Sequence, residues 1–64
     1  MRVTYDKQVD MLYMKLNDEK ISESSENSPG IIIDYSSDGN IIGFEIFQAS
    51  KKILDLTKVD FELL

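Results

Sequence analysis

Carboxylates are the side chains of this sequence that could do chemistry. Asp34, Asp38 and Glu45 lie within twelve residues, at the spacing with which calcium-binding loops present their oxygen ligands. Such a loop needs oxygens at positions one, three and five, a Gly at six and a bidentate Glu at twelve. The segment meets each requirement, with Ser36 at the third position and Gly39 at the sixth. The pattern therefore admits a divalent-cation or small-ligand site on Asp34, Asp38 and Glu45.

Two features favour a hairpin over a calcium loop. Calcium loops are flanked by helices, whereas the run from Gly30 to Ile33 is β-branched and follows a Pro. The ninth position is Ile42, where a polar residue is usual. A turn at Asp38 and Gly39 explains the same residues, because Gly adopts the positive φ of tight turns. We therefore expect no metal and no cofactor, and keep the ion or ligand site as the alternative.

The residues on which most enzymes depend are missing. The chain has no His and no Cys, which excludes disulfides, thiolate zinc sites and the usual base of a hydrolytic triad. An enzyme would have to work with Asp, Glu, Lys or Tyr alone, and so short a chain leaves little room for a pocket of about 300 Å³. Asp6 and Asp10 occupy turn-like positions, where Asp commonly accepts bonds from backbone amides. We predict that the protein is not an enzyme.

Size and charge constrain the partners. A chain of 64 residues makes one small domain, residues 1–64, which should be only marginally stable alone. Without disulfides or a metal, association into a homodimer is the expected source of further stability. A net charge of −5 argues against nucleic-acid binding and suits a basic protein partner. No signal segment or membrane-spanning run is visible, so we expect a cytoplasmic protein without a membrane partner.

Alternating apolar residues predict two β-hairpins. Pairing Tyr5 with Leu12 and Val3 with Met14 places four apolar side chains on one face of the first. In the second hairpin, centred on Asp38 and Gly39, the expected pairs are Ser36 with Ile41, Tyr35 with Ile42, Ile33 with Phe44, and Ile31 with Ile46. A shift by one residue would set apolar side chains against Gly and Glu, so the pattern favours this register.

Three other segments complete the expected fold. Residues 21–27 form either a polar edge strand paired with residues 12–16 or a loose connection. Ser50 can cap a short helix that begins at Lys51. Residues 59–63 alternate and form either a last strand or an extended tail, whose apolar residues could cover the sheet. The expected class is α+β: an antiparallel sheet of two hairpins, with four to five strands, and one short C-terminal helix.

The second face of the predicted sheet is the candidate interaction surface. It is too apolar for a solvated surface and too charged for a core, so cover by a second subunit would explain it. Glu45 stands between two apolar residues and could pair with Lys or Arg across such an interface. The residues predicted for this surface are Tyr13, Ile32, Ile41, Glu45 and Phe47.

Several short motifs together resemble the DUF2283 family of short prokaryotic proteins. They are Tyr5-Asp6, Asp10-x-Leu12-Tyr13-Met14-x-Leu16, Asp34-x(3)-Asp38-Gly39-Asn40-Ile41-x-Gly43-x-Glu45-Ile46 and Ala49-Ser50. The resemblance spans about Val3 to Leu54 and is thinnest across residues 20–29. It implies a compact antiparallel sheet with a small helix, and it brings no catalytic residues. The sequence thus predicts a small non-enzymatic interaction module, a homodimer with an antitoxin-like or regulatory role.

Overall fold

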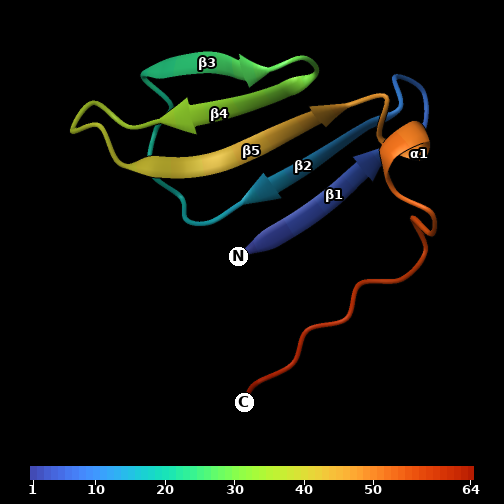
Figure 1. Ribbon diagram of the computed structural model, residues 1–64. Helices are drawn as coiled ribbons and strands as arrows, with labels where there is room; N and C mark the ends of the chain where they lie inside the picture. The colour runs from blue at the N-terminus through green and yellow to red at the C-terminus, as the bar shows by residue number, and fades with distance from the viewer.

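The computed structural model describes residues 1–64 as one five-stranded sheet followed by a short helix (Figure 1). The elements are β1 (Arg2–Asp6), β2 (Met11–Lys15), β3 (Glu23–Ser28), β4 (Ile31–Tyr35), β5 (Ile41–Phe47) and α1 (Ala49–Lys52). All neighbouring strands are antiparallel, in the order β1-β2-β5-β4-β3. The predicted α+β class is confirmed, with five strands. No helix in the chain has the length and apolar character needed to cross a membrane.

The first hairpin has the predicted register. Val3 pairs with Met14 and Tyr5 pairs with Leu12, so these apolar side chains share one face. The turn between β1 and β2 is closed by the Asp6 carboxylate, whose Oδ1 accepts a hydrogen bond from the Gln8 N–H at 2.9 Å. This is the bond to a turn amide that was expected of Asp at this position.

The register of the second hairpin is confirmed in part. Ile31 pairs with Ile46 and Ile33 with Phe44, as predicted, but the pairings of Tyr35 with Ile42 and of Ser36 with Ile41 are wrong. Tyr35 pairs instead with Ile41, across a β-bulge. The cause lies in the loop between the two strands. The Ser36 N–H donates to the Asn40 carbonyl at 2.9 Å, and the Gly39 N–H donates to the Ser36 carbonyl at 3.0 Å. These two hydrogen bonds close the loop.

The loop shifts one strand relative to the other. Gly39 has a φ of +83°, as predicted for the turn, and this conformation places Asn40 level with Ser36. Ile42 becomes the extra residue of the bulge, because Asp34 pairs with Gly43 and the next pair is Tyr35 with Ile41. The Ile42 side chain is almost completely buried, with 1% exposure.

The polar segment is an edge strand, but its predicted partner is wrong. β3 pairs with β4, at the far edge of the sheet from β1, and not with residues 12–16. β5 takes that place, pairing Leu12 with Ile46 and Met14 with Phe44. Apolar cross-strand pairs stabilise a sheet more than pairs with Ser and Glu would, so β5 is the better neighbour for β2. Residues 16–22 cross behind the sheet to reach β3 (Figure 1).

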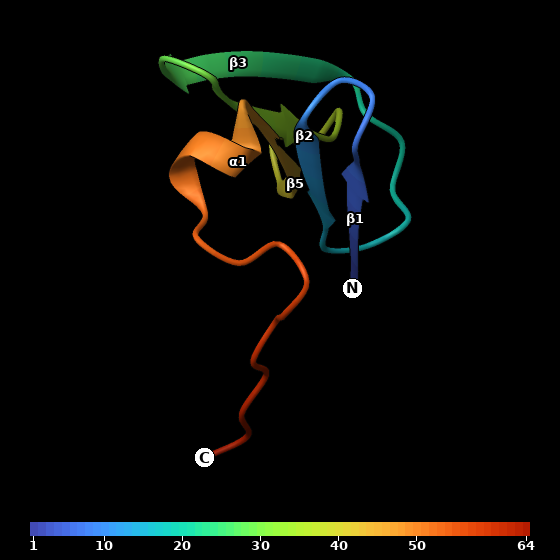
Figure 2. The same ribbon diagram turned by 90° about the vertical axis from the view of Figure 1, so that its right-hand side faces the viewer.

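The helix and the C-terminal segment also differ from expectation. α1 begins at Ala49, after Gln48 in the left-handed conformation, so Ser50 lies inside the helix and does not cap it. No strand follows α1. Leu54 and Phe61 are 107% and 76% exposed, so they do not cover the sheet of their own chain. Figure 2 shows residues 53–64 leading away from the strands.

The register divides the sheet into two faces, which we call the apolar face and the mixed face. The apolar face comprises Val3, Tyr5, Leu12, Met14, Ile31, Ile33, Tyr35, Phe44 and Ile46. The mixed face includes Thr4, Met11, Tyr13, Ile32, Asp34, Gly43, Glu45 and Phe47. α1 and residues 17–22 lie on opposite sides of the sheet (Figure 2).

The sheet has no second layer. The Tyr5 hydroxyl and Ser50 of α1 both donate to Asp10, which places the helix on the side of the apolar face. A four-residue helix can cover only one end of that face. All nine side chains of the apolar face are therefore half-buried, and none is fully buried. The chain folds around paired strands, with most of its apolar surface still partly in contact with water.

Candidate functional site

Four of the five predicted surface residues share the mixed face. Tyr13, Glu45 and Ile32 form one row across β2, β5 and β4, and Phe47 lies two residues along β5 from Glu45. All four are half-buried. Ile41 does not join them, because the bulge pairs it with Tyr35 of the apolar face. The bulge thus removes Ile41 from the predicted surface.

Glu45 has an acidic partner where a basic one was expected. Its side chain hydrogen-bonds Asp34, a buried residue with 5% exposure. Asp34 pairs with Gly43, whose missing side chain leaves the space next to the Asp34 carboxylate open. On its other side, β4 adjoins β3, and the Ser24 hydroxyl of β3 donates a hydrogen bond to Asp34 Oδ1 at 2.6 Å. Three neighbouring strands therefore bring together the buried Asp34 and the half-buried Glu45.

The pair changes the charge state of Glu45. Burial raises the pKa of the Glu45 carboxyl from 4.5 to about 7, and the hydrogen bond to Asp34 and the charge of Asp34 act in the same direction. A protonated Glu45 can donate a hydrogen bond to the Asp34 carboxylate, whereas two adjacent ionised carboxylates repel each other. The Glu45 carboxyl therefore holds its proton up to about neutral pH.

The third carboxylate of the calcium pattern is not brought to this pair. Asp38 is exposed in the loop between β4 and β5, while Asp34 and Glu45 lie on the strands. No group of three or more acidic side chains converges in the structure. The hairpin separates the ligand positions that a calcium loop would wrap around one ion.

A hollow of about 330 Å³ opens on the mixed face beside Asp34. Its polar and charged lining residues include Arg2, Thr4, Tyr13, Lys15 and Asp34, and Ile21 closes it from the crossing connection. The expectation that a chain of this length has little room for such a pocket is wrong. The space exists because the segment that joins β2 to β3 passes over the face of the sheet.

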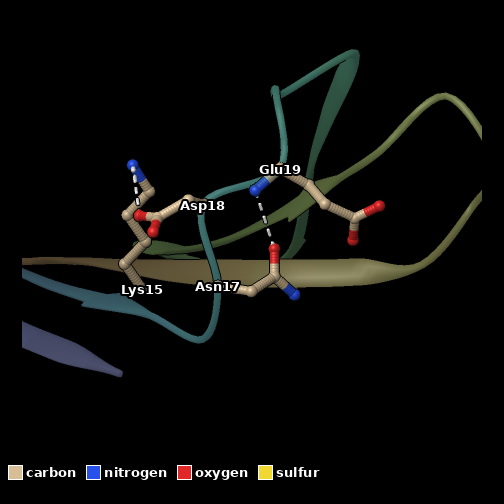
Figure 3. Close-up of polar contacts among 4 residues, drawn as sticks. All are labelled: Lys15, Asn17, Asp18 and Glu19. Carbon is tan, nitrogen blue, oxygen red and sulfur yellow. Dashed lines mark hydrogen bonds and ion pairs between the residues drawn. The ribbon is translucent and has the colours of Figure 1, made fainter.

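Local polar contacts shape the start of this connection (Figure 3). The Glu19 N–H donates to Asn17 Oδ1 at 2.9 Å, which closes a turn directly after β2. Lys15 Nζ lies 4.0 Å from Asp18 Oδ1, an exposed ion pair of little energetic weight. The turn, more than the ion pair, directs the chain across the face and brings Ile21 to the hollow.

A second polar cluster, centred on Asp10, joins the first turn to α1. Its carboxylate accepts hydrogen bonds from the Tyr5 hydroxyl at 2.7 Å, the Ser50 N–H at 2.9 Å and the Ser50 hydroxyl at 2.6 Å. These bonds, first those from Ser50, lower the pKa of Asp10, and the bond to Asp10 raises the pKa of Tyr5. Asp10 thus supplies the N-terminal acceptor that Ser50 was predicted to be. The only sequence signal was that Asp10 and Ala49-Ser50 both belong to the family motifs.

Comparison with known proteins supports the same assignment as the motifs. The DUF2283 family, described as a protein family of unknown function, matches residues 2–50, which include all five strands and the start of α1. No curated protein and no solved structure matches the chain. The match covers more than half of the 64 residues and contains both the pair of Asp34 and Glu45 and the cluster around Asp10. The chain belongs to the DUF2283 family.

Proposed function

We propose that this protein is a non-enzymatic interaction module that acts as a homodimer. The observation that supports it is the exposed surface of the single chain, 5247 Å². A globular monomer of 7.4 kDa exposes about 4,200 Å². The excess of about 1,000 Å² is similar to the roughly 800 Å² that each partner buries in a stable interface. Association of two chains would remove this excess.

The apolar face is the better candidate for the contact between copies. It carries nine half-buried side chains from four strands and no charged residue among them. The mixed face, in contrast, includes Asp34 and Glu45. Because the cores of interfaces are depleted of charge, two apolar faces packed about 10 Å apart would make the more stable pair. The surface predicted around Tyr13, Ile32 and Phe47 then stays accessible in the dimer.

The charge of the chain supports a basic protein as the further partner. Twelve acidic residues oppose seven basic ones, and β3 presents Glu23 and Glu26 at an exposed sheet edge. An acidic surface attracts a basic partner and speeds its association at low salt. A regulatory role, in which the dimer captures such a partner, agrees with the small size of the domain.

Two neighbouring residues of β4 allow a matched test of the interface. Ile33 faces the apolar side and Ile32 the mixed side, and both are half-buried. Ile33→Asp should convert the dimer to a monomer, whereas Ile32→Asp should leave it a dimer, as measured by sedimentation at about 10 µM with circular dichroism as the check on folding. Ile33→Thr and Ile32→Thr, which keep strand propensity, serve if an Asp variant does not fold. Loss of the dimer only in the Ile32 variants would place the interface on the mixed face.

One observation favours a second candidate function, the binding of a small ligand. The hollow beside Asp34 is of the size that small ligands occupy, and its lining combines the Asp34 carboxyl group with the cations Arg2 and Lys15. A divalent cation held by both Asp34 and Glu45 would have to displace the proton that Glu45 holds. Calorimetry with Mg²⁺ and Ca²⁺ at pH 8 tests this, and the absence of heat at millimolar ion concentration would exclude a divalent cation as the ligand.

A further inference from the structure

The segment after α1 has the pattern of a strand but pairs with nothing in its own chain. Val59, Phe61 and Leu63 alternate with charged residues, and their exposures are 70%, 76% and 89%. Exposed apolar side chains in strand-like alternation are typical of a segment that pairs with another sheet. The sheet offers two edges for such pairing, β1 and β3.

β1 is the edge that fits. β3 has the sequence Glu23-Ser-Ser-Glu-Asn-Ser28, so it offers no apolar side chain to a neighbouring strand. β1 alternates instead, with Val3 and Tyr5 half-buried on the apolar face and its other three residues exposed. A strand added along β1 would therefore extend the apolar face by its own apolar residues.

One register satisfies both faces of the added strand. In an antiparallel pairing of Phe61 with Val3, Val59 lies opposite Tyr5, and Asp60 opposite Thr4. The charged ends then match: Lys58 lies opposite Asp6, and Glu62 opposite Arg2.

Other registers bring unfavourable contacts. A shift of two residues in one direction sets Asp60 against Asp6, and in the other direction it sets Leu56 against Asp6. A parallel pairing that keeps the apolar contacts sets Lys58 against Arg2 and Glu62 against Asp6. Like charges directly opposite each other destabilise a sheet, so the antiparallel register is preferred.

We propose that residues 58–63 form a sixth strand along β1 of a second copy of this chain, an exchange that rests on the homodimer proposed above. The path of the chain supports exchange over pairing within one chain. The Thr57 N–H donates to Asp55 Oδ1 at 2.9 Å, which fixes a turn after α1, and residues beyond it lead away from their own β1 (Figures 1 and 2). A two-fold dimer would contain the contact twice.

Charge reversal in two different chains tests the exchange. Arg2→Glu alone and Glu62→Lys alone each place like charges opposite each other at both contacts of a homodimer. In a mixed dimer of the two variants both contacts join opposite charges. We expect each variant alone to dimerise about tenfold more weakly than the wild type, and the 1:1 mixture to recover affinity to within about threefold of it. Sedimentation and fluorescence anisotropy of a labelled chain measure the affinities.

A charge reversal outside β1 provides the matched control. Lys20→Glu makes the same change of charge on an exposed residue outside β1. Its mixed dimer with Glu62→Lys still joins like charges at one of the two contacts, so this mixed dimer should be weaker than the one between Arg2→Glu and Glu62→Lys. No recovery in the Arg2→Glu mixture overturns the exchange while the wild-type dimer stands. Recovery only when both substitutions are in one chain also overturns it, because the strand then pairs within its own chain. A wild type that is monomeric at 10 µM instead overturns the homodimer itself.

Discussion

Replacing Glu45 by Gln should make the protein more stable at pH 8 and change little at pH 5. Gln keeps the shape of a protonated Glu and can donate to Asp34, but it cannot ionise. A carboxyl whose pKa is raised by folding favours the folded state while it is protonated. That contribution is fully present below its ordinary pKa of 4.5 and is lost as pH rises through about 7. Glu45→Gln should not lose this stability as pH rises, because Gln does not ionise.

The size of the effect follows from the two pKa values. They differ by about 2.5, which corresponds to about 3.4 kcal/mol at 1.36 kcal/mol for each pH unit. Glu45 is only half-buried, and solvent screening reduces this to about 1–2 kcal/mol. For a domain of this size the melting temperature of Glu45→Gln at pH 8 should be about 5–15 °C above that of the wild type.

Urea denaturation at pH 5 and pH 8, followed by circular dichroism at one fixed protein concentration, measures the difference. Glu23→Gln is the matched control, since Glu23 is exposed on β3 and should show no gain at pH 8. If the stability of Glu45→Gln depended on pH as that of the wild type does, the raised pKa of Glu45 would be refuted.

Two further predictions concern packing and the Asp10 cluster. Gly43→Ala should lower the free energy of unfolding by about 1–3 kcal/mol, because the added Cβ would lie 2.8 Å from the Met14 carbonyl oxygen. In Gly39→Ala the added Cβ meets no atom, so this variant should lose only about 1 kcal/mol, through the positive φ of residue 39. Urea midpoints of the two variants compare them. Asp10→Asn should lower the urea midpoint at pH 7, and this deficit should shrink as pH falls below about 4, because the lowered pKa of Asp10 makes its contribution one that acid removes. Asp6→Asn, with a single bond to a turn amide, should change the midpoint less, and an equal loss would argue against the Asp10 cluster as the joint to α1.

Local alternation was enough to predict most of the sheet. The first hairpin, the pairs of Ile31 with Ile46 and Ile33 with Phe44, and the turn at Gly39 follow from side-chain period and turn chemistry. The bulge at Ile42 depends on how Ser36 and Asn40 bond within the loop, which alternation does not report. Its consequence was large for the candidate surface, since Ile41 changed sides.

Contacts between segments far apart in the sequence could not be predicted from the local pattern of side chains. Nothing local shows that β5 and not β3 adjoins β2, because that choice depends on the competing pairs of all three strands. The acceptor for the N-terminus of α1 lies forty residues away, at Asp10. The contact of Ser24 with Asp34 likewise depends on the order of the strands, which places β3 next to β4.

We propose that two chains associate to cover a sheet that one chain leaves half-exposed. Sedimentation equilibrium of the unmodified protein at about 10 µM tests it most directly. We predict twice the 7.4 kDa mass of a single chain, with the dimer lost in Ile33→Asp and retained in Ile32→Asp. A folded wild-type protein that sediments at 7.4 kDa would contradict this association.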